Sequence, residues 1–229
     1  MPKKTSLKAK KIKVDKAEAR NRVKKILPLL KKTYPNAKIA LNYKNPLELL
    51  IATILSAQCT DVRVNIVTAE VFKKYKSADD WANADITEIE SDIKSTGFYH
   101  NKAVSIKNAC AKIEQELGGQ VPDTMEELLQ LPGVGRKTAN VVLGNAFATA
   151  AIACDTHVIR LSRRLGLSEN SNAVKLEFDL AEIVPKARWT MFSHLLIFHG
   201  RNCCRARKPD CRNCSISKYC PAANRAELW

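Results

Sequence analysis

Residues 131–143 have the sequence LPGVGRKTANVVL, with two glycines two residues apart between apolar runs. Gly133 and Gly135 predict a tight turn between two helices, because glycine adopts positive φ without strain and lets a second backbone approach closely. The free N–H groups and the positive end of the following helix are expected to form an anion site. The stretch therefore predicts a helix, a glycine turn and a second helix that together accept a phosphate.

A lysine and an aspartate accompany this turn. Lys137 falls in the first turn of the second helix, where we expect the helix dipole and Arg136 to favour the uncharged, nucleophilic amine. Asp155 precedes Thr156-His157-Val158-Ile159 and is a good helix N-cap, which as an isolated residue explains it fully. A capping carboxylate is also held in a fixed position, so the cap role is compatible with a catalytic one.

Composition and charge bound the class of protein. The chain has 229 residues, 45% of them hydrophobic, which suffices for a core in one domain or two small ones. A formal net charge of +15 favours a polyanionic partner, and without a long uncharged apolar run nucleic acid is a better prediction than a membrane. Lysines crowd into residues 1–20, which we predict to be a disordered basic arm that attracts phosphates or only solvates the chain.

Apolar residues recur at helical spacing along the chain and no stretch alternates as a strand does, so we predict an all-α protein. Asn45 is expected to cap a strongly apolar helix over 47–57, with Pro46 in its first turn. Thr60 or Asp61 is expected to cap the next helix. The other predicted helices cover 17–32, a segment through Val62, Ile66, Ala69 and Phe72, residues 85–96 up to Gly97, a helix with Ala103, Ile106, Cys110, Ile113 and Leu117 inward, residues 124–131, 156–165, 173–184 and 188–198.

Most of the eight cysteines crowd into residues 203–220. Such clustering predicts a metal or cluster site in a reducing compartment rather than a set of disulfides. Four thiolates at the spacing C-x6-C-x2-C-x5-C satisfy either a tetrahedral zinc ion or a [4Fe-4S] cluster, and spacing alone does not separate the two. The predicted ligands are Cys204, Cys211, Cys214 and Cys220, and the adjacent Cys203 competes for the first place.

The LPGVGRKTA turn, the later aspartate and the cysteine block together resemble the endonuclease III branch of the helix-hairpin-helix DNA glycosylases. HGR at 199–201 and ARKP at 206–209 recur in that family with the cysteines around them. The resemblance favours iron-sulfur over zinc. It implies a two-domain helix-hairpin-helix glycosylase fold, with a six-helix domain over 39–150 and an iron-sulfur cluster domain formed by 21–38 and 151–229.

The resemblance also implies roles for individual residues. Lys137 would be the nucleophile and Asp155 the catalytic carboxylate. Gln58 would fill the space left by an extruded nucleotide, and Phe98 would enter the base stack as an apolar wedge. The residues implied to contact DNA are these last two and Gly133, Gly135, Arg136, Thr138, Arg205, Arg207 and Lys208; those implied to line the damaged-base pocket are Asp61 and His157.

These implications predict a bifunctional DNA glycosylase and abasic-site lyase, which excises oxidised pyrimidines from duplex DNA and cleaves 3′ of the lesion by β-elimination in base excision repair. Two alternatives stay open: a pyrimidine-dimer glycosylase of the same architecture, and a non-catalytic helix-hairpin-helix module that only binds DNA. We expect a monomer that binds damaged duplex DNA and no membrane. Its expected location is the cytoplasm of a bacterial or archaeal cell, at the nucleoid, or the nucleus of a eukaryotic one.

Overall fold

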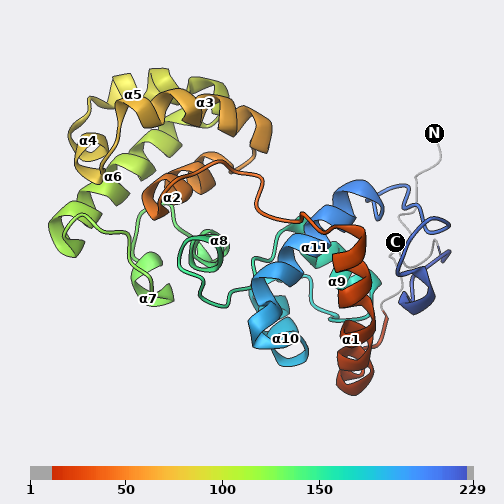
Figure 1. Ribbon diagram of the computed structural model, residues 1–229. Helices are drawn as coiled ribbons and strands as arrows, with labels where there is room; N and C mark the ends of the chain where they lie inside the picture. The colour runs from red at the N-terminus through yellow and green to blue at the C-terminus, as the bar shows by residue number, and fades with distance from the viewer. Residues whose placement is uncertain (1–11, 226–229) are drawn as a thin grey trace, which may run out of the picture. The chain divides into compact units, whose positions relative to one another are not determined.

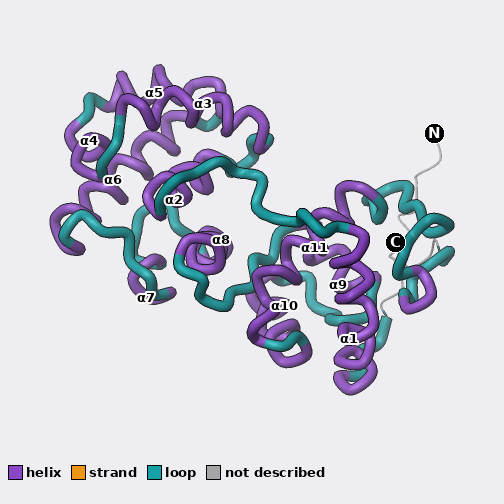
Figure 2. The backbone as a smooth tube through the Cα atoms, in the orientation of Figure 1, coloured by secondary structure: helices purple, strands orange, loops and turns teal. Residues whose placement is uncertain are grey.

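A computed structural model describes residues 12–225, and every regular element in this part of the chain is helical (Figure 1). Figure 2 shows helices joined by loops, with no strand among the described residues. The all-α prediction is therefore confirmed. Within residues 12–225, none of the helices has both the length and the apolar character needed to cross a membrane.

The chain divides into two compact units, each with its own hydrophobic core. One unit is continuous and comprises Ile39–Ala151, where the sequence prediction had placed its first domain at 39–150. The other is discontinuous and comprises Met1–Lys38 and Ile152–Trp229, of which the described part is 12–38 and 152–225.

The continuous unit is built around α2 (Pro46–Leu55), whose residues from Leu49 to Leu55 are all buried. The Asn45 side chain accepts a hydrogen bond from the backbone N–H of Glu48 at 2.9 Å, so the predicted cap is confirmed. Helix α2 packs against α3, α6 and α8. The remaining elements of this unit are α3 (Asp61–Lys74), α4 (Ala78–Asn83), α5 (Ile86–Ile93), η1 (Lys94–Thr96), α6 (Tyr99–Leu117), α7 (Met125–Leu128) and α8 (Arg136–Ala146).

Two helices of this unit differ from the sequence prediction. The short α4 was not predicted, although Ser77 and Asp80 form a complete capping box at its start. Helix α3 begins after Thr60, which caps it as one of the two expected residues, but it buries a different face. Its buried side chains are Val64, Val67, Thr68 and Val71, whereas Val62 and Ile66 are 71% and 56% exposed.

Helix α6 carries the longest inward face of the unit. The predicted inward residues Ala103, Ile106, Cys110 and Ile113 are buried, and Lys102 is buried beside them. The helix packs against α2, α4, α5 and η1, and Gly118, which caps its C-terminus, has a φ of 59°, as a helix-ending glycine should.

The discontinuous unit brings the N-terminal helix against helices from the C-terminal part of the chain. Helix α1 packs on α10, α11 and η3, and α9 packs on α11. The elements of this discontinuous unit are α1 (Lys16–Thr33), α9 (Thr156–Arg164), α10 (Ala173–Ile183), η2 (Lys186–Arg188), α11 (Trp189–Asn202) and η3 (Ser217–Tyr219).

The last residues of the basic arm expected over 1–20 are helical rather than disordered. The side chain of Asp15 accepts a hydrogen bond from the backbone N–H of Glu18 at 2.8 Å and starts α1 at Lys16, so residues 16–20 are helical. This part of the prediction was wrong because the cap sits within the lysine-rich segment. Residues 1–11 of the expected arm lie outside the described part of the chain.

Candidate functional site

The glycine turn before α8 is held against α6. Gly133 has a φ of 77°, and a Cβ atom placed there would lie 2.6 Å from the Cβ of Ser105. Only glycine meets both conditions, because L side chains rarely adopt this φ and no real Cβ comes so close to another carbon. Gly135 differs from the expectation: its φ is −93°, which is extended backbone, and the space where a Cβ would lie is open.

Helix α8 therefore begins with an open N-terminus. Gly135 is its N-cap and supplies no side-chain acceptor for the first N–H groups. Lys137 in the first turn is exposed, and Arg136 and Thr138 beside it are half-buried. The positive end of a helix favours anions, so the first turn of α8 is a candidate anion site beside the Lys137 amine.

Asp155 is fixed as the N-cap of α9. Its Oδ1 accepts a hydrogen bond from the backbone N–H of Val158 at 2.8 Å, which confirms the predicted cap. The residue is half-buried and follows the buried Cys154, so the backbone is anchored on the core side while the carboxylate faces the helix start.

His157 is held in its neutral form within the same unit. Its Nδ1 lies 3.1 Å from Nη2 of Arg160, and since arginine only donates, this ring nitrogen accepts. Burial lowers the pKa of His157, against the opposing effect of the Asp155 carboxylate. The ring packs against Gly200, where a Cβ atom would lie 2.6 Å from Nδ1, so the glycine of the HGR stretch allows α9 and α11 to approach closely.

Gln58 and Phe98 share an unusual backbone conformation. Their φ angles are 54° and 50°, in the left-handed region that residues other than glycine seldom occupy. Both side chains are exposed, and Phe98 is 62% exposed although it is a large apolar residue. Asp61, the first residue of α3, is half-buried. Strained backbone at exposed loop residues is frequent at functional sites.

The C-terminal cysteines surround one cavity. Its lining includes all four predicted ligands, Cys203 and His199. All eight cysteines of the chain carry free thiols. The predicted DNA-contacting residues Arg205, Arg207 and Lys208 lie in the loop between the first two predicted ligands, and all three are exposed.

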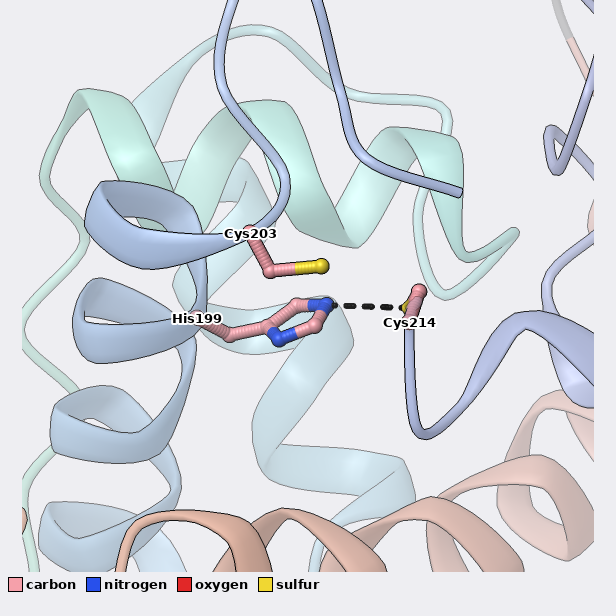
Figure 3. A group of neighbouring side chains, drawn as sticks. All are labelled: His199, Cys203 and Cys214. Atoms are coloured by element: carbon pink, nitrogen blue, oxygen red, sulfur yellow. Dashed lines mark hydrogen bonds between the residues drawn. The ribbon is translucent and has the colours of Figure 1, made fainter. Parts of the chain in front are cut away.

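Cys203 lies beside two other residues of this cavity, His199 and Cys214. The ligand atoms of His199, Cys203 and Cys214 all lie within 4.8 Å of one another. Figure 3 shows these three side chains gathered at one place. His199 Nε2 is 3.5 Å from Cys214 Sγ, and its Nδ1 is 3.1 Å from the hydroxyl of Tyr34. With the proton on Nε2, the histidine accepts from the tyrosine and donates towards the sulfur.

The chemistry of this donor set fits a metal centre. Burial raises the pKa of Cys203 to about 12 and that of Cys220 to about 11, and it also raises the pKa of Cys214. Neutral thiols gain little from such a cavity, whereas a bound metal deprotonates them and compensates their charge. The cysteine-lined cavity is therefore a candidate metal site.

Two arginines of α9 brace the cysteine loop. Arg164 is 5% exposed and donates to the carbonyl oxygens of Arg205 at 2.9 Å and Ala206 at 2.7 Å. Arg160 donates to the carbonyl oxygens of Gly200 at 3.1 Å and Cys204 at 3.0 Å. Neither arginine was predicted to take part in the site, although Arg164 lies on the helix face of the buried Leu161 and this periodicity was a usable signal.

The structure thus brings some of the predicted residues together within one unit and places others in different units. The four predicted cysteine ligands line one cavity, and Gly133, Gly135, Arg136, Lys137 and Thr138 form one turn. Lys137 belongs to the continuous unit and Asp155 to the discontinuous one.

Comparisons with known proteins agree with this architecture. Residues 51–186 match the family model described as "HhH-GPD superfamily base excision DNA repair protein". Endonuclease III of Synechocystis sp. is 51% identical over 208 residues, which cover 90% of this chain and 95% of the relative. Endonuclease III of Bacillus subtilis is 46% identical, with 82% of this chain and 86% of the relative covered.

A solved structure gives the same result in three dimensions. The "Structure of a non-covalent Endonuclease III-DNA Complex" superposes with a TM-score of 0.85 at 43% identity and covers 90% of this chain and 96% of that one. The helical fold and the glycine turn therefore define a helix-hairpin-helix base excision DNA repair protein. Within that class, the chain belongs to the endonuclease III family. It is a base excision repair DNA glycosylase with lyase activity, and the alternative of a non-catalytic binding module is set aside.

Proposed function

We propose that this protein excises oxidised pyrimidines from duplex DNA and cleaves the abasic site by β-elimination, with Lys137 as the nucleophile. The observation that carries the proposal is the exposed Lys137 in the open first turn of α8, directly after a glycine turn fixed by Ser105. A relative that is 43% identical was solved as a "Trapped Endonuclease III-DNA Covalent Intermediate", which supports a covalent mechanism for this chain.

The reaction begins when the Lys137 amine bonds to C1′ of the deoxyribose. The glycosidic bond breaks, and the base leaves with the bonding electrons and takes up a proton. The amine then loses a proton, the C1′–O4′ bond opens as O4′ takes up a proton, and a protonated Schiff base joins Nζ to C1′. This iminium acidifies the 2′ proton, whose removal expels the 3′ phosphate and cleaves the strand.

Asp155 acts on the charge that develops on the sugar. A carboxylate stabilises the oxocarbenium character of C1′ and assists the proton transfers that follow. The hydrogen bond from Val158 holds this carboxylate in place before substrate arrives, so no reorganisation is needed during the reaction.

DNA binding falls to exposed groups of both units. The N-terminus of α8 takes a phosphate, and Arg205, Arg207 and Lys208 attract the backbone of the duplex. Gln58 and Phe98 enter the space that the damaged nucleotide vacates, since an inserted side chain offsets part of the lost stacking. We further propose that the protein acts as a monomer, in the DNA-containing compartment of its cell.

The metal centre is proposed to be a [4Fe-4S] cluster held by Cys204, Cys211, Cys214 and Cys220. When bound, it supplies a rigid covalent frame and no step of the base excision chemistry. The exposed basic residues between Cys204 and Cys211 are held in position by this frame and by Arg164.

Borohydride trapping on duplexes with one lesion each tests the mechanism and the substrate class. We expect wild-type protein to become covalently attached to DNA that carries an oxidised pyrimidine, and Lys137→Ala to abolish attachment while DNA binding persists. Lys76→Ala is the matched control, because Lys76 is an exposed lysine of the same unit outside the glycine turn. Trapping by Lys137→Ala would refute the nucleophile, and trapping only on a pyrimidine dimer would replace the proposed substrate class.

A further inference from the structure

Lys102 is a buried lysine with a defined pair of hydrogen-bond acceptors. Its side chain projects from the inward face of α6, and the residue is 5% exposed. The ammonium donates to the carbonyl oxygen of Leu55 at 2.8 Å and to that of Thr96 at 2.9 Å. Such burial is costly for a charged group and is rare without strong partners.

Both acceptors are the last carbonyl groups of their helical elements. Leu55 is the last residue of α2, and Thr96 is the last residue of η1. The final carbonyls of a helix lack partners within it and carry partial negative charge, so a cation at this place satisfies and stabilises them. One side chain therefore joins the ends of two elements that lie far apart in the sequence.

The two loops that follow these ends carry the residues proposed to enter the duplex. Gln58 lies in the loop after α2, and Phe98 lies between η1 and α6. Both residues have left-handed backbone. Both side chains are exposed, so packing does not hold them in place. The side-chain hydrogen bonds of Ser56 and Thr96 stay within their own turns, so they do not link the two loops to each other.

Burial disfavours the charged form of the Lys102 side chain. Burial lowers its pKa, and Cys59, which lies in the Gln58 loop, opposes this shift. Cys59 is partly buried against the core of the same unit. The lysine is thus linked to the start of the Gln58 loop through the Leu55 carbonyl.

We propose that Lys102 is a positioning residue, which fixes the Gln58 loop and the Phe98 loop at the spacing needed to open a base pair. The inference rests on the proposed role of these two loops, and it adds a residue that does not touch DNA. Removing the ammonium leaves two buried carbonyls without a donor and releases both loops at once. The chemical steps at Lys137 do not require it.

Two DNA substrates separate loop positioning from general damage to the fold. Each carries the same oxidised pyrimidine, which in one is paired with a purine in a continuous duplex and in the other faces a one-nucleotide gap. The paired site must be opened and the vacancy filled, whereas the gapped site needs neither. The measured quantity is the ratio of single-turnover cleavage rates on the two substrates.

The test variant is Lys102→Met, which keeps the aliphatic stem and removes the donors. The matched control is Lys107→Met, because Lys107 also projects from α6 and donates to two carbonyls, those of Ala82 at 2.6 Å and Ala84 at 2.7 Å, away from both loops. If Lys102→Met does not fold, Lys102→Gln takes its place, because its side chain is uncharged and one bond shorter and so weakens both contacts without placing an apolar group beside the carbonyls. Thermal unfolding of all variants checks the fold.

We expect Lys102→Met to cleave the paired site roughly 10- to 100-fold more slowly than wild type while it cleaves the gapped site at nearly the wild-type rate. Lys107→Met should leave the ratio unchanged even where it lowers the melting temperature. An equal fall on both substrates, or the same change of ratio in Lys107→Met, would overturn the inference. Failure of the wild type to cleave either substrate would instead refute the proposed function.

Discussion

Nη1 of Arg164 lies 3.4 Å from Sγ of Cys204, and the guanidinium of the same residue also holds two carbonyl oxygens of the loop that follows that cysteine. A buried cation beside a thiolate ligand compensates its charge, and hydrogen bonds to ligand sulfurs tune such centres. We therefore predict that Arg164→Met binds its cluster less firmly. Visible charge-transfer absorbance should decay faster in the presence of an iron chelator than in wild type or in Arg163→Met. Equal decay in all three would contradict the prediction.

Serine substitution of single cysteines tests which of them bind the proposed cluster. We predict that Cys204→Ser purifies with little iron, whereas Cys203→Ser keeps a full complement, although the Cys203 thiol lies beside Cys214 and His199. Iron and zinc content by metal analysis gives the answer directly. The reverse result would assign Cys203 as the first ligand, and stoichiometric zinc in the wild type would replace the proposed cluster.

Asp155 allows its catalytic role to be separated from its cap. In Asp155→Asn the amide oxygen still accepts from Val158, so stability should change little, while cleavage should fall by roughly 100-fold or more. Asp155→Ala should in addition lose about 1 kcal/mol of stability. Asp15→Asn changes the cap of α1 in the same way and serves as the control, with activity unaffected. Normal cleavage by Asp155→Asn would leave the residue with a structural role only.

The two glycines of the turn should respond in opposite ways. Gly133→Ala meets both an unfavourable φ and Ser105, so we predict a loss of about 1 to 3 kcal/mol in the free energy of unfolding. Gly135→Ala has ordinary backbone and open space, so it should fold normally and lose DNA affinity, because the methyl group obstructs a phosphate. Urea unfolding and a DNA binding titration measure the two effects. Full affinity in Gly135→Ala would show that no phosphate approaches there.

Acid should destabilise the protein in part through His157. Its pKa is lowered below the ordinary value of 6.5 by burial, so the unfolded chain takes up this proton more readily than the folded one. The stabilising contribution is complete above about pH 6.5 and is lost as the pH falls through the lowered pKa. His157→Gln does not titrate, and its unfolding midpoint should fall less between pH 7 and pH 5. Parallel slopes in the two proteins would contradict this account.

Much of the fold was accessible from the sequence because its signals are local. Asn45 before Pro46, Asp155 before Thr156 and Gly97 after η1 each start or end a helix through chemistry that a few residues contain. The face of α3 was not accessible in this way. The segment carries two interleaved apolar rows, and only packing against the rest of the unit decides that Val64, Val67 and Val71 are buried rather than Val62 and Ile66.

The site was predictable where residues are adjacent and not where they are joined by folding. The LPGVGRKTA turn and the cysteine spacing can be recognised in the sequence alone. The contact between Gly133 and Ser105 depends on tertiary structure. Lys102 left a signal that was overlooked: it stands one helical turn before Ile106, in phase with the buried residues of α6. A charged residue in an apolar row is a sign that it has a specific partner inside the protein.

Helix α6 begins directly after Phe98, carries Lys102 one turn later, and supports the glycine turn through Ser105 in the turn after that. This helix, with a rise of about 1.5 Å per residue, thus sets the spacing of the three loops that are proposed to contact DNA. An insertion or deletion of one residue in its first two turns would shift all three loops relative to one another while leaving each loop's own sequence intact. Length, rather than side-chain identity, is then the property of this segment that the enzyme has least freedom to change.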